Sequence, residues 1–191
     1  MWVVKLGGSL HDAVALRPRL AELASMPGPP RIVVPGGGPF ADTVRESQPR
    51  LGFDDLAAHR MAILAMQQYG LALQSLEPRL TLAQTEAELR AAHASVWLPW
   101  AMVGLDEDIE PSWTVTSDSL AAWLATRLGA ELLILIKSAP LPADQASAAE
   151  LARAGLVDPA FPAHARRFGG AIRIAHRDTT LPGGPYLSVR G

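Results

Sequence analysis

Two lysines are the first residues in this chain whose chemistry asks for an explanation. The chain has 17 lysines and arginines, and only Lys5 and Lys137 are lysines. Each lies at or near the end of an apolar run, MWVVK and LLILIK, where surface lysines are not usual. A compact ammonium fits a tight phosphate pocket as a point charge, whereas a planar guanidinium does not. The alternative is a general drift towards arginine that spared two lysines by accident, and we favour the phosphate pocket.

Two glycine-rich turns could supply the rest of such a pocket. The pair at 7–8 follows a predicted strand at 2–6, and the triplet at 36–38 follows a predicted strand at 31–34; a predicted helix comes after each. A strand, a glycine turn and a helix start let backbone N–H groups converge on an anion. Glycine is also ordinary in such turns, so one pair alone would be weak, but two turns in one sheet favour anion binding. Neither matches the P-loop or the dinucleotide pattern.

A carboxylate is expected between the lysines. Asp118 lies in the first turn of a predicted helix at 117–128, where the helix dipole favours a negative charge. This helix leads directly into the strand at 132–136, so Asp118 and Lys137 should meet at one edge of the sheet. A carboxylate between two lysines would fix their positions and keep both charged. Helix capping alone is the alternative explanation for Asp118.

Other chemistry has less support. None of the five histidines has a metal-binding spacing such as HExxH, and we expect no metal held by the protein. His59 is the histidine of interest, because it lies on a predicted long helix at 54–76. The acidic run at 106–108 is interpreted as a solvated loop. No GxSxG turn supports hydrolysis.

Strands and helices alternate along the chain. Further strands are predicted at 96–98, 172–175 and 186–189, and the last of these is expected at the edge of the sheet. Further helices are predicted at 12–26, 40–47, 86–92 and 148–154. A break in helical structure is predicted at 48–53. This alternation predicts an α/β fold with a mostly parallel sheet between helices. Ligands of such sheets bind at the carboxyl ends of the strands, where both glycine turns and Lys137 fall. On the long helix, the apolar face is assigned to Leu56, Met61, Leu64, Ala65 and Leu71.

The composition narrows the class of protein. The 191 residues are 49% hydrophobic and 19% charged, which is typical of one globular domain spanning 1–191. The net charge of -2 argues against nucleic acid as a partner. There is no cysteine, and hence no disulfide or thiolate metal site. No apolar run approaches the roughly 20 residues that span a bilayer, and we expect a cytoplasmic protein without membrane contact.

Three strings together resemble the amino acid kinase superfamily. They are KLGGS at 5–9, PGGG at 35–38 and TSDSLAAWLATRLGAELLILIK at 116–137, and their order and spacing also fit. The resemblance runs from residue 1 to about 175 and implies a three-layer αβα sandwich. Within the superfamily the chain is most similar to the small kinases of methanofuran-type cofactor synthesis, which use ATP to convert (5-(aminomethyl)furan-3-yl)methyl phosphate to its diphosphate. The strings that carry this second resemblance are GGGPFADTVR at 36–45, AHRMAILAMQQYG at 58–70 and ELARAGLVDPAFP at 150–162.

The resemblance implies a role for each matching residue. Lys5 would contact the transferred phosphoryl group, and Asp118 would organise the lysines. The ATP phosphates would be cradled by Gly7, Gly8 and Ser9. The acceptor would be held by the backbone N–H groups of Gly36, Gly37 and Gly38, and its pocket would be lined by His59. It also implies Mg²⁺ held mainly by the nucleotide, a small-molecule phosphate acceptor and a homo-oligomer. For the acceptor's amine, our hypothesis is an acidic residue of the loop at 106–110.

The chain departs from the superfamily after Ile136. Many members have Thr-Asp and a glycine-containing loop there, whereas this chain has KSAP at 137–140. We infer that Lys137 replaces a later lysine that some members use against the phosphates. Two alternatives stay open: a kinase for another small carboxylate or phosphate, and a catalytically weak nucleotide-binding or assembly protein of the same fold.

Overall fold

A mixed sheet runs through the computed structural model, which describes residues 1–10, 14–106, 108–142 and 145–190. Its order is β3-β4-β2-β1-β5-β7-β8-β6. The strands are β1 (Trp2–Leu6), β2 (Arg31–Pro35), β3 (Thr81–Ala83), β4 (Ala94–Trp97), β5 (Leu132–Lys137), β6 (Ala146–Ser147), β7 (Ala171–His176) and β8 (Leu187–Arg190). Neighbouring strands are parallel except β7 and β8, which are antiparallel. The mostly parallel sheet is therefore confirmed.

Helices cover both faces of this sheet. They are η1 (Gly8–Leu10), α1 (Leu16–Ser25), α2 (Gly38–Leu51), α3 (Asp55–Leu76), α4 (Glu86–Ala91), α5 (Trp100–Val103), α6 (Ser117–Leu128), α7 (Ala148–Arg153) and α8 (Phe161–Arg167). One core cluster joins the sheet to α4, α6, α7 and α8, and a second joins its other face to α1 and the later part of α3. The predicted three-layer αβα sandwich is confirmed.

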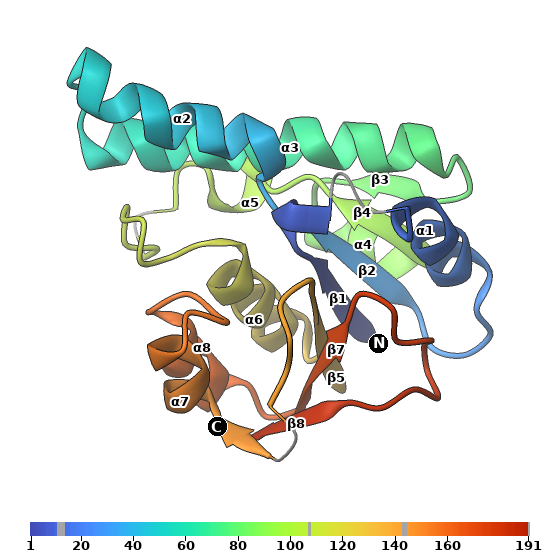
Figure 1. Ribbon diagram of the computed structural model, residues 1–191. Helices are drawn as coiled ribbons and strands as arrows, with labels where there is room; N and C mark the ends of the chain where they lie inside the picture. The colour runs from blue at the N-terminus through green and yellow to red at the C-terminus, as the bar shows by residue number, and fades with distance from the viewer. Residues whose placement is uncertain (11–13, 107, 143–144, 191) are drawn as a thin grey trace.

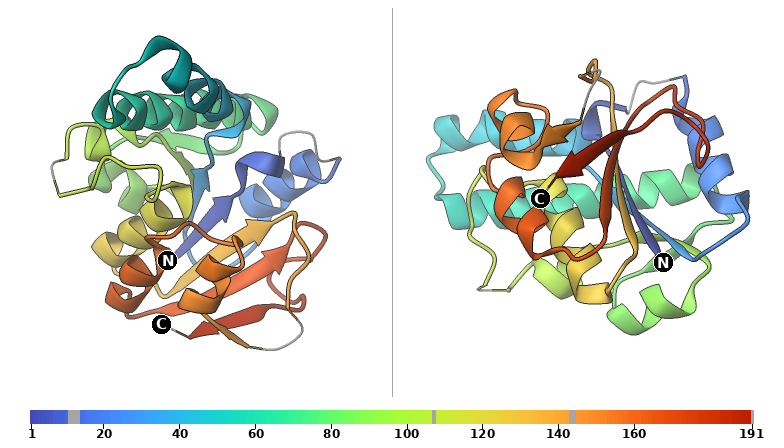
Figure 2. Two further views of the ribbon diagram at one scale, coloured as in Figure 1. Left: turned by 60° about the vertical axis from the view of Figure 1, so that its left-hand side comes forward. Right: turned by 90° about the horizontal axis from the view of Figure 1, so that it is seen from below.

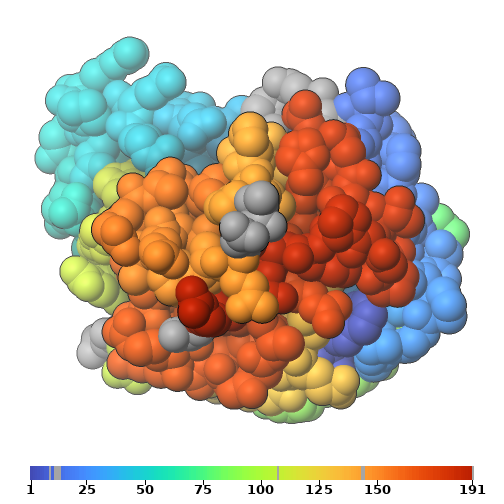
Figure 3. Space-filling model, turned by 60° about the horizontal axis from the view of Figure 1, so that its bottom comes forward, coloured from blue at the N-terminus to red at the C-terminus, as the bar shows by residue number. Residues whose placement is uncertain are grey.

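The two helices α2 and α3 lie side by side across the end of the sheet where β1 and β2 finish (Figures 1 and 2). The segments after about residue 140 form the opposite side of the molecule, and the cyan end of α2 projects beyond them (Figure 3). Among the described residues, no helix is long and apolar enough to cross a membrane.

Several predicted boundaries are confirmed, because local signals set them. α6 begins at Ser117 and ends at Leu128, and Gly129, which follows it, has a φ of 62°, the left-handed conformation that glycine adopts readily. α3 begins after Asp54, whose side chain accepts a 2.8 Å hydrogen bond from the Ala57 N–H.

Other boundaries were predicted wrongly. α2 continues to Leu51 through Pro49, so the break predicted at 48–53 comes only at Gly52, with φ of 73°. Pro49 is tolerated because it lies in the exposed last turn, where the lost hydrogen bond disturbs little of the helix. β8 is not an edge strand, because the two-residue β6 pairs outside it. The prediction missed β3, β6, α5 and α8, and residues 12–13 of the predicted first helix lie outside the described residues.

The predicted apolar face of α3 is also wrong. Of its five residues only Ala65 is buried. The residues that α3 does bury are Ala58, His59, Ile63, Ala65, Met66, Tyr69, Gly70 and Leu73. A small residue explains the choice of face: a Cβ at Gly70 would lie 2.9 Å from a methyl of Leu98 and 3.3 Å from one of Val96. The helix therefore packs closely on the sheet along the line that contains Gly70, and Leu56, Met61, Leu64 and Leu71 lie outside this contact.

Candidate active site

Strand register brings the two lysines to one face of the sheet. Lys5 on β1 is the register partner of Leu135 on the neighbouring parallel strand β5. Successive side chains along a strand point to opposite faces, so Lys137, two residues beyond Leu135, shares the face of Lys5. Val3 and Leu133, which lie on this face, belong to the core cluster that includes α6. Both ammonium groups therefore face the layer that contains α6.

Asp118 on the first turn of α6 lies between them. Its Oδ1 is 2.9 Å from the Lys5 Nζ, and its Oδ2 accepts a 2.6 Å hydrogen bond from the Lys137 Nζ. The side chains of Lys5 and Asp118 are each 6% exposed and that of Lys137 is 13% exposed. The structure thus brings together the three residues that the sequence assigns to catalysis. We call Lys5, Asp118 and Lys137 the charged cluster.

Burial and mutual charge shift the pKa values in this cluster. Burial alone would raise the pKa of the Asp118 carboxyl, but the two ammonium groups outweigh it and hold that pKa at about 2. Burial and repulsion from Lys5 lower the pKa of Lys137 to about 8, because attraction to Asp118 offsets them only in part. At neutral pH the cluster carries two positive charges and one negative charge. A phosphate oxygen is the kind of group that would balance it.

Asp158 supports the start of α6 and was not predicted from the sequence. Its buried carboxylate accepts hydrogen bonds of 3.0 Å from the N–H groups of Thr116 and Ser119, 2.8 Å from the Thr116 hydroxyl and 2.9 Å from the Phe161 N–H. The Ser119 hydroxyl donates to it as well. Asp158 therefore caps α6 and α8 together. Because Asp118 lies between Thr116 and Ser119, Asp158 fixes the backbone that carries the central carboxylate.

The two glycine turns contact each other directly. A Cβ on Gly36 would lie 2.4 Å from the Gly8 nitrogen, and one on Gly8 would lie 2.6 Å from the Gly38 nitrogen. The N–H groups of Gly7 and Gly36 continue the sheet, donating to the carbonyls of Ile136 at 3.3 Å and Leu6 at 2.9 Å. These two amides are therefore engaged within the protein. The first turn of α2, which begins at Gly38, has N–H groups without an acceptor inside the helix.

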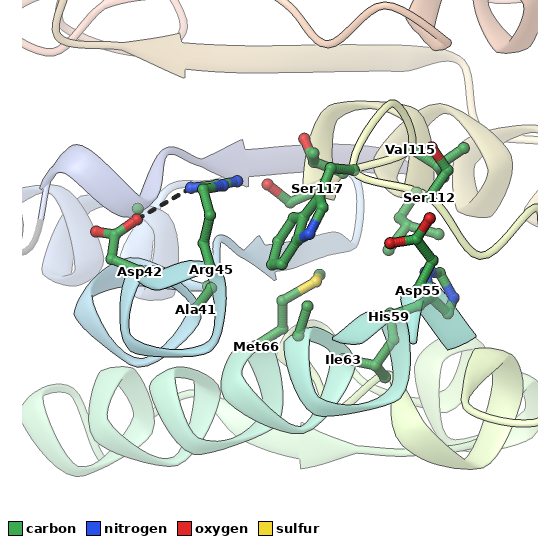
Figure 4. A pocket seen from close by; sticks show the side chains of 17 residues that line it. Ala41, Asp42, Arg45, Asp55, His59, Ile63, Met66, Ser112, Val115 and Ser117 are labelled. Carbon is green, nitrogen blue, oxygen red and sulfur yellow. Dashed lines mark hydrogen bonds and ion pairs between the residues drawn. The ribbon is translucent and has the colours of Figure 1, made fainter. Parts of the chain in front are cut away.

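A cavity of about 170 Å³ opens beside these turns (Figure 4). It is lined by Gly8, Gly37 and Gly38; by Ala41, Asp42 and Arg45 of α2; by Asp55, His59, Ala62, Ile63 and Met66 of α3; and by Ser112, Trp113, Val115, Thr116, Ser117 and Leu120. The charged cluster is not part of this lining, but Ser117 and Gly8 connect the cavity wall to it. The cavity is a candidate acceptor site that meets the glycine turns at one end.

His59, which the resemblance assigns to the acceptor pocket, lines this cavity. The side chain is buried, and burial followed by repulsion from Arg60 lowers its pKa, which favours the neutral imidazole at pH 7. The hypothesis for the acidic loop is not supported, because no described residue of 106–110 lines the cavity. The carboxylates there belong to Asp42 and Asp55 instead. The side chain of Ser9, and His11, lie outside the described residues.

The comparisons with known proteins agree with this fold. The sequence model of the group described as "Amino acid kinase family" matches residues 1–140. The chain belongs to the amino acid kinase family. It is 30% identical over 139 residues to the [5-(aminomethyl)furan-3-yl]methyl phosphate kinase of Methanocaldococcus jannaschii, an alignment that covers 71% of this chain and 64% of that protein. The chain therefore matches slightly less than two thirds of the length of this relative.

Solved structures resemble the chain over nearly its whole length. Uridylate kinase from Archaeoglobus fulgidus has a TM-score of 0.72 at 18% identity, with 99% of each chain covered. Aspartate kinase from Synechocystis has a TM-score of 0.72 at 16% identity, with 99% of this chain and 40% of that chain covered. At these identities the similarity concerns the fold.

Proposed function

We propose that the protein is an ATP-dependent kinase that phosphorylates a small phosphomonoester, (5-(aminomethyl)furan-3-yl)methyl phosphate, to its diphosphate. The observation that carries the proposal is the charged cluster, with its excess positive charge buried beside two touching turns of bare backbone. The similarity to the kinase of Methanocaldococcus jannaschii supports this choice of acceptor.

The proposed chemistry fits what these residues offer. An oxygen of the acceptor phosphate attacks the γ-phosphorus of ATP, the bond from that phosphorus to the β–γ bridging oxygen breaks, and ADP leaves with the electron pair. A phosphomonoester is mostly a dianion at pH 7, since its second pKa is about 6, so the attacking oxygen needs no strong general base. What the reaction requires is positioning and neutralisation of charge on the transferred group. Lys5 and Lys137 would supply that neutralisation, with Asp118 holding both ammonium groups in place.

In this proposal each glycine turn binds the phosphates of one of the two substrates. The ATP phosphates lie over the turn formed by Gly7, Gly8 and Ser9, although the N–H of Gly7 is engaged with Ile136 and does not donate to them. The acceptor phosphate lies at Gly37 and Gly38, at the start of α2. Gly36 serves mainly the close packing of the turns, because its N–H is engaged with Leu6. Mg²⁺ would neutralise the β and γ oxygens and be carried by them. Among the described residues there is no group of three or more histidines and carboxylates suited to a metal ion.

For the base and ribose of ATP we propose a second cavity, of about 560 Å³, lined in part by His176, Thr179 and Tyr186. His176 is the register partner of Lys137 across β5 and β7. The register pairing puts His176, and with it one wall of this cavity, beside the end of β5 that carries Lys137. This arrangement would compensate for the departure from the superfamily pattern after Ile136.

The test combines turnover with binding. The protein is mixed with ATP, Mg²⁺ and the furan phosphate, and the diphosphate and ADP are quantified for the wild type and for Lys5→Ala and Lys137→Arg. We expect equal amounts of both products from the wild type and a large loss in both variants. ATP binding without turnover would favour the nucleotide-binding alternative, and turnover only with other carboxylates or phosphates would favour the other kinase alternative.

Three further expectations stay predictions: the single domain, the cytoplasmic location and the homo-oligomer. For the homo-oligomer, we propose that α3 supplies the contact between subunits, because it exposes four apolar side chains: Leu56, Met61, Leu64 and Leu71. Light scattering on the purified protein would give the molar mass that decides it.

A further inference from the structure

The charges around the acceptor cavity do not balance. Asp42 and Arg45 neutralise each other through an ion pair of 3.2 Å. Asp55 forms no ion pair among the described residues, and His59 contributes no positive charge while its imidazole is neutral. Figure 4 shows Asp42 with Arg45 on one side of the cavity and Asp55 with His59 on the other. The negative charge left over is therefore localised at Asp55.

A hydrogen-bonded chain holds the Asp55 carboxylate in position. The Trp113 indole donates a 2.6 Å hydrogen bond to Gln48 Oε1, and Gln48 Nε2 donates one of 2.8 Å to Asp55 Oδ1. The indole N–H can only donate, so it fixes which end of the Gln48 amide faces Asp55. Asp55 Oδ2 has no partner among the described residues. The carboxylate is thus oriented by one oxygen and free to bind a ligand with the other.

The same cavity offers a flat apolar wall and an anion site. The Trp113 ring lines the cavity together with Met66. The Arg45 guanidinium lies over this ring, 4.4 Å from its centroid. Gly37 and Gly38 lie in the lining at the start of α2, where backbone N–H groups can bind a phosphate. A ligand that satisfies all three features carries a phosphate, a flat ring and a cation.

We propose that Asp55 is a specificity-determining residue that binds a primary ammonium group of the acceptor. Gln48 and Trp113 are positioning residues that keep its carboxylate directed into the cavity. The acceptor class is then a phosphomonoester whose aromatic ring carries a protonated aminomethyl group. This inference rests on the proposed function and adds to it the residue that selects the acceptor.

The test compares two acceptors in four proteins. The acceptors are the aminomethyl furan phosphate and the analogue with methyl in place of aminomethyl. The proteins are the wild type, Asp55→Asn, Asp55→Glu and Glu46→Gln. Glu46 is an exposed acid on the same helix as Arg45 that does not line the cavity, so Glu46→Gln removes an equal charge outside the site. Steady-state rates give kcat and KM for each pair.

The wild type should prefer the amine in kcat/KM by about tenfold or more, as expected for a charge-assisted contact. Asp55→Asn should lose this preference through a higher KM for the amine, and thermal unfolding of the purified variant checks separately that it folds. Asp55→Glu should keep part of the preference, and Glu46→Gln all of it. A preference that survives in Asp55→Asn would overturn the proposal.

The test separates this inference from the proposed function. A wild type that phosphorylates both acceptors equally well leaves the kinase proposal standing and refutes the role of Asp55. If neither acceptor is phosphorylated, the proposed function fails, and calorimetric binding of the two phosphates to the wild type and Asp55→Asn still decides the role of Asp55. Tighter binding of the amine that depends on Asp55 supports it, and equal binding refutes it.

Discussion

Lys137 donates a 2.6 Å hydrogen bond to Asp118 from the last residue of β5 to the first turn of α6. Despite this contact the pKa of Lys137 is only about 8, because burial and the nearby Lys5 oppose its charge. The ammonium that would neutralise the migrating phosphoryl group is thus close to losing its proton at mildly alkaline pH.

The first prediction concerns the pH dependence of activity. Lys137 is charged below pH 8 and neutral above it, so kcat/KM, which reports the free enzyme, should fall as pH rises through about 8. Anionic ATP stabilises the ammonium, and kcat should therefore fall at a higher pH. Lys137→Arg stays charged and should lose this alkaline limb, whatever its absolute rate. A limb that persists in Lys137→Arg would assign it to the acceptor's amine instead.

The second prediction concerns stability, which should change with pH in the opposite direction to activity: the contribution of Lys137 to the free energy of unfolding should rise where kcat/KM falls. The pKa of Lys137 is lowered from 10.5, so between about pH 8 and 10.5 the unfolded chain binds more protons than the folded one. The contribution of Lys137 to the free energy of unfolding should therefore rise across this window. Chemical denaturation of the wild type and Lys137→Arg at several pH values measures it, and equal slopes would contradict the lowered pKa.

Replacing Asp118 by Asn should damage both stability and activity. It leaves two buried ammonium groups facing each other, and loss of one partner of a buried ion pair costs about 3–5 kcal/mol. Lys137 would relieve part of this by releasing its proton, and so activity at pH 7 should fall by at least about 100-fold. Denaturation curves and initial rates measure the two effects, with Glu46→Gln as the matched loss of a surface carboxylate. Wild-type rates in folded Asp118→Asn would contradict the role of the charged cluster.

Asp158→Ala tests the support of α6. The N–H groups of Thr116, Ser119 and Phe161 lose a buried acceptor, and an unsatisfied buried donor costs about 1–3 kcal/mol. We expect the free energy of unfolding to fall by about 3 kcal/mol or more, and the rate to fall with it as Asp118 loses its position. Thr85→Ala is the control, because Thr85 caps α4 and its loss should cost about 1 kcal/mol without changing the rate. Equal rates in Asp158→Ala and Thr85→Ala would show that Asp158 does not contribute to activity through the position of Asp118.

Gly36→Ala tests the contact between the glycine turns. The new Cβ would lie 2.4 Å from the backbone nitrogen of Gly8, which cannot move aside without shifting η1. We expect a loss of about 1–3 kcal/mol in stability, together with lost activity. A Cβ on Gly169 meets nothing within 4 Å, so Gly169→Ala should change stability by less than about 0.5 kcal/mol. Similar thermal unfolding of Gly36→Ala and Gly169→Ala would show that the two turns can accommodate a Cβ at Gly36 and would contradict this prediction.

Local signals were enough to predict the charged cluster. Lys5 and Lys137 end apolar runs, and the carboxyl ends of neighbouring parallel strands meet at one edge of the sheet. The acidic start of α6 was visible in TSDS, which placed Asp118 at the same edge. No information from outside these segments was needed, because adjacent strands and one connecting helix determine the geometry.

The remainder of the site depends on tertiary contacts that the sequence pattern does not reveal. Asp158 caps α6 from 39 residues away, counted to Ser119. Gln48, Asp55 and Trp113 come from α2, α3 and a loop, and their contact requires the three-dimensional arrangement. The acidic loop at 106–110 drew attention through its local charge density, which says nothing about the direction in which a loop lies. The buried face of α3 was missed because apolar residues lie on both sides of this helix, and the close approach to the sheet at Gly70 decides which side faces inward.

The measurement closest to the central claim is phosphorus NMR of the reaction of ATP with the furan phosphate, in wild type and in Lys5→Ala of matched thermal stability. We predict that the wild type forms the diphosphate and that Lys5→Ala forms it at least about 100-fold more slowly. Diphosphate formation by Lys5→Ala at the wild-type rate would contradict the account.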